Sequence, residues 1–194
     1  MGAGGLPGPH ICGGVGMIPF PDKKYKVILA DPPWPEGHHR MSTKYWGMTS
    51  SSSDHYLLMS GDQIKSLPVQ NIVDPAGCVL FLWSPYRHIQ LALDVINSWG
   101  FVYKTIGFVW IKITKHRPFK FIINPGFYTK ANTEPCFIAT CGRVPIPVAG
   151  DISQIVMTKR GEHSEKPVEV MIGINRLYPS LPKIELFARR KMKS

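Results

Sequence analysis

The chain has 194 residues and carries 23 Lys and Arg against 13 Asp and Glu, a formal net charge of +10. This length suits one domain, and the apolar share of 44% excludes wholesale disorder. The sequence contains no run of about 18 apolar residues, so no transmembrane helix is predicted. The positive charge favours an anionic partner, with nucleic acid ahead of a membrane surface.

Residues 1–22 are dense in Gly and Pro and are expected to form a flexible arm, which leaves 23–194 as a single domain. After this arm, short apolar runs typical of buried strands alternate with segments in which apolar residues recur at helical spacing. We expect strands over 27–30, 78–83, 105–111, 135–140, 152–157 and 184–188, and helices over 62–67, 89–99 and 167–177. The alternation predicts an α/β fold with a mostly parallel sheet flanked by helices.

Cysteine and histidine do not form a metal-binding pattern. The four cysteines, Cys12, Cys78, Cys136 and Cys141, include no CxxC pair, and free thiols in a reducing compartment are expected. His38, His39 and His55 lack the spacing of a tetrahedral zinc site, so we expect no metal.

The segment Asp31-Pro32-Pro33-Trp34 ends the first strand abruptly, because two prolines cannot continue the ladder. Ligands of open α/β sheets bind beyond the carboxyl ends of the strands. A carboxylate, exposed carbonyls and an aromatic face within four residues suit a planar base that carries an amino group. A plain turn with a packing tryptophan is the structural alternative.

Ala30-Asp31-Pro32-Pro33-Trp34 resembles the signature of the DPPW-type adenine-N6 methyltransferases, relatives of the catalytic subunit of the messenger-RNA adenine methylase. Further segments agree with that family in order and spacing, and the match favours its phage and bacterial branch. They are His55-Tyr56-Leu57-Leu58-Met59-Ser60, Leu80-Phe81-Leu82-Trp83, Asn132-Thr133-Glu134-Pro135-Cys136, Glu162-His163-Ser164-Glu165-Lys166-Pro167 and Ile184-Glu185-Leu186-Phe187-Ala188-Arg189. The resemblance spans about residues 25–190 and implies a Rossmann-like methyltransferase fold.

By this resemblance, a methyl group passes from S-adenosylmethionine to the 6-amino nitrogen of adenine. The catalytic segment is Asp31, Pro32, Pro33 and Trp34, in which Asp31 and the Pro32 carbonyl hold the amine. Trp34 and Tyr56 are candidate stacking faces for a base that must be flipped out or single-stranded. The resemblance assigns base contacts to Tyr56, Glu134 and Lys166, and donor contacts to Asp31, Ser164, Lys166, Glu185, Phe187 and Arg189.

Several alternatives stay open for individual residues. Glu185 and Phe187 alternate with Ile184 and Leu186, so the two are expected to share a face, although Phe187 could instead pack in the core. Trp83 is expected in the core. The basic loop with Lys112, Lys115, Arg117 and Lys120 could follow a nucleic-acid backbone or could simply be a solvated surface.

The family usually continues past the last strand with a Trp-Gly-Asn segment whose Asn meets the donor's ribose. This sequence ends at Ser194 before such a segment, and we therefore expect reduced donor affinity. DNA is the expected substrate, in the cytoplasm of a bacterial or phage-infected cell, or in the nucleus if the source is eukaryotic. The alternative functions are RNA methylation and a non-catalytic partner subunit that binds nucleic acid. The sequence is also compatible with a homodimer or with a complex that includes a partner subunit.

Overall fold

The structure is a computed structural model and describes residues 20–35, 58–115, 118–123, 128–159 and 165–188. Six strands form one sheet in the order β5-β3-β4-β2-β1-β6. Their bounds are β1 Val27–Ala30, β2 Gly77–Trp83, β3 Val102–Ile113, β4 Thr133–Gly142, β5 Ile155–Lys159 and β6 Lys183–Leu186.

The strands are mostly parallel, as the sequence predicted. β1 pairs in parallel with β2 on one side and with β6 on the other, and β3 pairs in parallel with β5. Among the described strands β4 alone is reversed, since it pairs antiparallel with both β2 and β3. The start of β4 therefore lies at the same edge of the sheet as the carboxyl ends of its neighbours.

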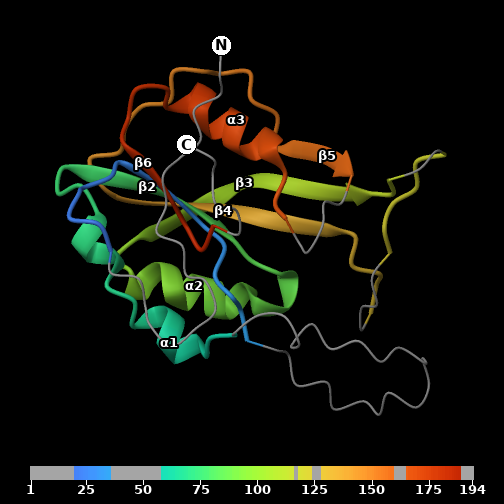
Figure 1. The fold of residues 1–194 in the computed structure, drawn as a ribbon, viewed down its shortest axis with the longest axis horizontal. Coiled ribbons are helices and arrows are strands. Elements are labelled where there is room, and N and C mark those ends of the chain that lie inside the picture. Colours follow the sequence, from blue (N-terminus) through green and yellow to red (C-terminus); the bar gives the residue numbers. More distant parts are fainter. Residues whose placement is uncertain (1–19, 36–57, 116–117, 124–127, 160–164, 189–194) are drawn as a thin grey trace.

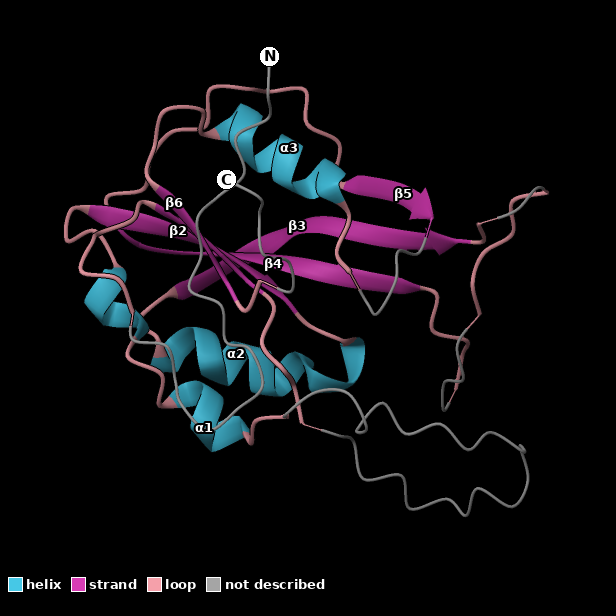
Figure 2. Ribbon diagram, viewed as in Figure 1, coloured by secondary structure: helices cyan, strands magenta, loops and turns pink. Residues whose placement is uncertain are grey.

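Helices cover both faces of the sheet (Figures 1 and 2). α1 (Gly61–Lys65) and α2 (Ile89–Ser98) lie on one face and α3 (Val168–Leu177) lies on the other. Two short 3₁₀ helices, η3 (Val69–Ile72) and η4 (Tyr86–His88), join these elements. A capping box begins α1, in which Ser60 and Gln63 exchange hydrogen bonds between side chain and backbone.

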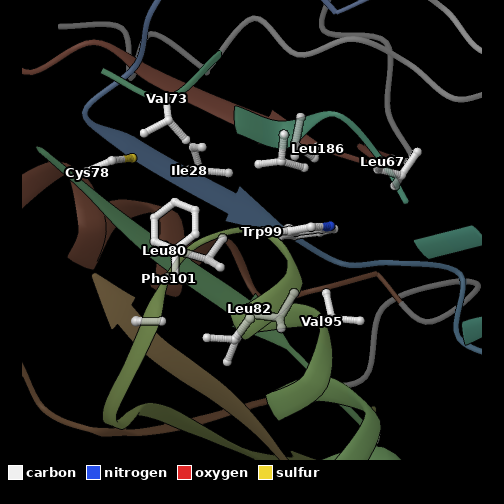
Figure 3. Close-up of a cluster of buried hydrophobic side chains, with 14 of the residues drawn as sticks. Ile28, Leu67, Val73, Cys78, Leu80, Leu82, Val95, Trp99, Phe101 and Leu186 are labelled. Atoms are coloured by element: carbon white, nitrogen blue, oxygen red, sulfur yellow. The ribbon is translucent and has the colours of Figure 1, made fainter. Parts of the chain in front are cut away.

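The core consists of two clusters separated by the sheet. Because successive side chains of a strand point to opposite faces, Ile28 and Ala30 of β1 pack toward α2, whereas Val27 and Leu29 pack toward α3. Figure 3 shows the first cluster, where Ile28, Leu80, Leu82 and Leu186 from the central strands lie together with Val95 and Trp99. Burial on both faces explains why β1 is apolar throughout.

The predicted helices and strands are confirmed, with shifts at their ends. β3 begins at Val102 rather than at 105. The prediction missed this start because the first residues of the strand are exposed and polar in part, so they do not form a continuous apolar run. β5 begins at Ile155 rather than at 152. Cys78, Cys136 and Cys141 are free thiols, as expected, and Cys12 lies outside the described residues. No helix in the described part of the chain is long and apolar enough to cross a membrane.

Candidate active site

The Asp31 turn, residues 31–35, leaves the carboxyl end of β1, which lies between β2 and β6. The Asp31 N–H donates to the Leu186 carbonyl of β6 at 3.4 Å, which is the last tie to the sheet on that side. The Trp34 N–H then donates to the Pro32 carbonyl at 2.8 Å and closes a tight turn. Met59 N–H donates to the Pro33 carbonyl at 2.9 Å, so the segment before α1 supports the turn from outside.

Four charged side chains form a chain of ion pairs at this edge, which we call the ion network: Asp31, Lys166, Glu134 and Lys112. The Lys166 Nζ lies 2.9 Å from Asp31 Oδ1 and 2.8 Å from Glu134 Oε1. The other oxygen of Glu134, Oε2, lies 2.6 Å from Lys112 Nζ. Carboxylates and ammoniums thus alternate from the end of β1, through Lys166 two residues before α3, to β4 and β3, and their charges cancel.

The ion network is withdrawn from solvent. The side chains of Asp31 and Glu134 are each 11% exposed, and those of Lys166 and Lys112 are 14% and 16% exposed. Two rings lie beneath the cations, since Lys166 Nζ is 5.4 Å from the centroid of Trp83 and Lys112 Nζ is 4.7 Å from that of Trp110. Charges at this depth are uncommon unless they are paired, and they often mark a functional site.

Pairing keeps Glu134 and Lys166 ionised despite their burial. Burial by itself would raise the pKa of Glu134, but the Lys166 and Lys112 ammoniums outweigh it and hold that pKa below its ordinary value. Burial would lower the pKa of Lys166, but the Asp31 and Glu134 carboxylates outweigh it and raise that pKa. Lys166 therefore remains a cation and Glu134 an anion at neutral pH.

Trp34 anchors the turn and is not an open stacking face. Its side chain belongs to the core cluster beside α2 and is only 6% exposed. The indole Nε1–H donates to the carbonyl of Trp83 at 3.0 Å, which ties the turn to the end of β2. The expectation that Trp34 offers an exposed face to a base is wrong in this structure, because the ring is buried where the turn folds back.

Lys112 is not part of a solvated loop, which corrects the sequence-based assignment. It lies near the end of β3, where its ammonium is already neutralised by Glu134. Lys115 and Lys120 are exposed beyond it, in a hairpin in which Thr114 N–H donates to the Lys120 carbonyl at 2.9 Å. Arg117 lies outside the described residues.

The last strand places its candidate donor residues differently from the alternation that the sequence suggested. Phe187 follows β6 with a φ of 65°, a left-handed conformation uncommon for a residue other than glycine. Its ring packs with Ile184 and Leu186 in the core, so it does not share a face with the half-buried Glu185. Tyr56, Ser164 and Arg189 lie outside the described residues.

The structure therefore brings together Asp31, Glu134 and Lys166 as the sequence predicted, and it adds two residues that the sequence did not single out for this place. Lys112 joins through the register of β3 and β4, which pairs Trp110 with Glu134. His88 of η4 stacks against Trp34, with ring centroids 6.0 Å apart. No sequence signal identified His88. No cluster of metal-binding side chains occurs among the described residues.

Comparisons with known proteins agree with this geometry. The MT-A70 family profile matches residues 25–194. The chain is 38% identical over 182 residues to the Type II methyltransferase M.MunI of a Mycoplasma species, which covers 88% of this chain and 74% of that protein.

More distant relatives are eukaryotic. The chain is 26% identical over 166 residues to the N(6)-adenosine-methyltransferase catalytic subunit METTL3 of Homo sapiens, and spans 26% of that protein's length. It is also 26% identical to the N(6)-adenosine-methyltransferase MT-A70-like protein of Drosophila melanogaster, of which it spans 24%. The resemblance inferred from the motifs is thus confirmed, the sheet and its flanking helices agree with a Rossmann-like methyltransferase fold, and the chain belongs to the MT-A70 family of methyltransferases.

Proposed function

We propose that this protein transfers a methyl group from S-adenosylmethionine to the 6-amino nitrogen of adenine in DNA. The observation that carries the proposal is the buried Asp31 carboxylate at the end of β1, held by Lys166 at 2.9 Å. DNA is favoured because the bacterial Type II methyltransferase is 38% identical, whereas the relatives named as adenosine methyltransferases are 26% identical.

The Asp31 turn suits an exocyclic amine. The 6-amino nitrogen of adenine is a poor nucleophile, because its lone pair is delocalised into the ring. A carboxylate has about four lone-pair sites, so the bond from Lys166 to Oδ1 does not exhaust Asp31 as an acceptor. The Pro32 carbonyl likewise keeps a lone pair after accepting the Trp34 N–H. Together they would hold the amine in place and stabilise the positive charge that develops on it.

The charged groups at this edge also fit the methyl donor of the family. S-adenosylmethionine supplies a methyl group on a positively charged sulfur, and it carries a carboxylate, an ammonium and a ribose. Lys166 can bind a carboxylate, Asp31 can face positive charge, and the half-buried Glu185 can accept hydrogen bonds from a ribose. Ser164, Arg189 and Phe187 remain proposed donor contacts from the resemblance alone.

The target adenine must leave the duplex to reach a turn at this depth, at a cost of a few kcal/mol. Glu134 and Lys166 would contact its polar edge, and Tyr56 remains the proposed stacking partner. Lys115 and Lys120 extend beyond the site on an exposed hairpin and would contact phosphates. Such an enzyme would work where bacterial or phage DNA lies, in the cytoplasm.

Transfer of a labelled methyl group to duplex DNA, single-stranded DNA and RNA tests the proposal. Wild-type protein should label adenine in DNA, and Asp31→Ala should lose most of that activity, since removal of one well-placed polar group commonly costs about 100-fold or more. Asp62→Ala is the matched control, because that carboxylate is exposed and lies on α1.

Each other outcome has a definite meaning. Labelling of RNA alone would favour the second candidate function, RNA adenine methylation, which the names of the eukaryotic relatives support. Binding of nucleic acid with no transfer above that of Asp31→Ala would identify a non-catalytic partner subunit and would refute the proposal.

A further inference from the structure

His88 contacts the Asp31 turn through the ring of Trp34. It ends η4, the short helix that follows β2, and its imidazole ring lies nearly parallel to the indole of Trp34, at an interplanar angle of 16°. Trp34 is thereby fixed twice. Its N–H is bound by the carbonyl of Trp83, and its ring is covered by His88.

The neighbours of His88 favour its neutral form. Arg87 Nε donates to His88 Nε2 at 3.1 Å, so this nitrogen is an acceptor. Burial, and then the Arg87 charge, lower the pKa of His88, which keeps the ring neutral as this arrangement requires.

We propose that His88 is a positioning residue for methyl transfer: it holds the Asp31 turn in place by stacking on Trp34. The inference rests on the proposed function, because it assigns His88 a role in presenting Asp31 and the Pro32 carbonyl to the amine. This contact falls on Trp34, in the same turn as Asp31, while the imidazole ring itself remains half-exposed at the surface.

The expected effect is on the rate of the chemical step. A misplacement of about 1 Å can cost about 100-fold in rate, so His88→Ala should lower kcat by roughly 10- to 100-fold. The KM values for the donor and the oligonucleotide should change little, because His88 is assigned no contact with either. The melting temperature should fall only slightly, since the side chain is half-exposed.

Two conservative variants test whether the ring itself holds the turn. His88→Phe keeps a ring on Trp34, whereas His88→Gln keeps a polar side chain and loses the ring. His88→Phe should recover part of the kcat lost in His88→Ala, and His88→Gln should not. Tyr86→Phe is the control in the same short helix, since it removes only a hydroxyl that accepts from Thr133.

An independent measurement does not require activity. The Trp34 indole N–H, assigned in an NMR spectrum by comparison with Trp34→Phe, should exchange with solvent faster in His88→Ala than in wild type. The inference is overturned if kcat and this exchange both remain at wild-type values in His88→Ala. It is also overturned if kcat falls only in proportion to lost folded protein and His88→Phe restores none of it. If wild type methylates no nucleic acid, the proposed function fails, and the exchange measurement alone decides whether His88 holds the turn.

Discussion

Replacement of Lys166 by Met tests whether the ion network supports the structure as well as the chemistry. Met keeps the length and apolar stem of the side chain but removes the ammonium that lies 2.9 Å from Asp31 and 2.8 Å from Glu134. Glu134 still has the Lys112 ammonium at 2.6 Å. The loss of the Lys166 ammonium therefore affects Asp31 most. Its side chain is only 11% exposed, and solvent can replace little of the lost interaction.

The size of the effect follows from this burial. Removal of one partner from a buried ion pair costs about 3–5 kcal/mol of folding free energy. For a chain of this length, each kcal/mol lowers the melting temperature by about 2–4 °C, so a fall of roughly 6–20 °C is expected. The Lys166 pKa is raised in the folded protein, against the effect of burial, so its stabilisation is fully present below the ordinary lysine pKa and hence at neutral pH.

Thermal and urea unfolding at neutral and mildly acidic pH measure the loss. Lys65→Met is the matched control, because Lys65 pairs with Asp62 at the same 2.8 Å but with side chains 35% and 91% exposed, and exposed pairs contribute little. If Lys166→Met unfolds no earlier than Lys65→Met, the ion network does not stabilise the fold and the argument is wrong.

Two further predictions concern charge. Glu134 has a lowered pKa because Lys166 and Lys112 outweigh its burial, so its stabilisation is present above the ordinary range and lost as pH falls through the lowered value. Urea unfolding across acidic pH should therefore show a shallower loss of stability for Glu134→Gln than for wild type, and equal slopes would contradict the assignment. The double variant Lys115→Gln/Lys120→Gln should reduce the slope of log affinity for DNA against log salt by about 2. Fluorescence anisotropy measures that slope, and an unchanged value would remove both lysines from the phosphate contacts.

The sequence allowed most of the sheet to be predicted, because a strand buried on both faces is a continuous apolar run. The direction of β4 could not be predicted in the same way. Its central residues are buried like those of the parallel strands, and the reversal depends on how β3 turns back. Of the two alternatives for Phe187, the structure shows packing in the core, because alternation assumes extended backbone and its φ of 65° breaks that assumption just after β6.

The site was predicted where motif residues lie at strand ends, as Asp31 and Glu134 do. Lys112 was assigned to a surface because its partner is 22 residues away, and their contact exists only through the register of two antiparallel strands. His88 carried no signal, since a histidine in a short turn is unremarkable until the fold places it against Trp34. The local pattern thus predicted candidate residues, while tertiary pairing decided which charges are neutralised.

The position of β1 between β2 and β6 has a consequence for how the protein is assembled. β1 is synthesised early in translation, yet one of its two neighbouring strands is β6, residues 183–186, the last strand that the structure describes. Until β6 docks, one edge of β1 is open and Asp31 lacks the Leu186 carbonyl that its N–H binds. Contacts so distant in sequence form slowly, and an unpaired strand edge in the meantime is prone to pair with other chains. A fragment that stops before Lys183 would keep the whole Asp31-Pro32-Pro33-Trp34 motif and still lack the framework that positions it.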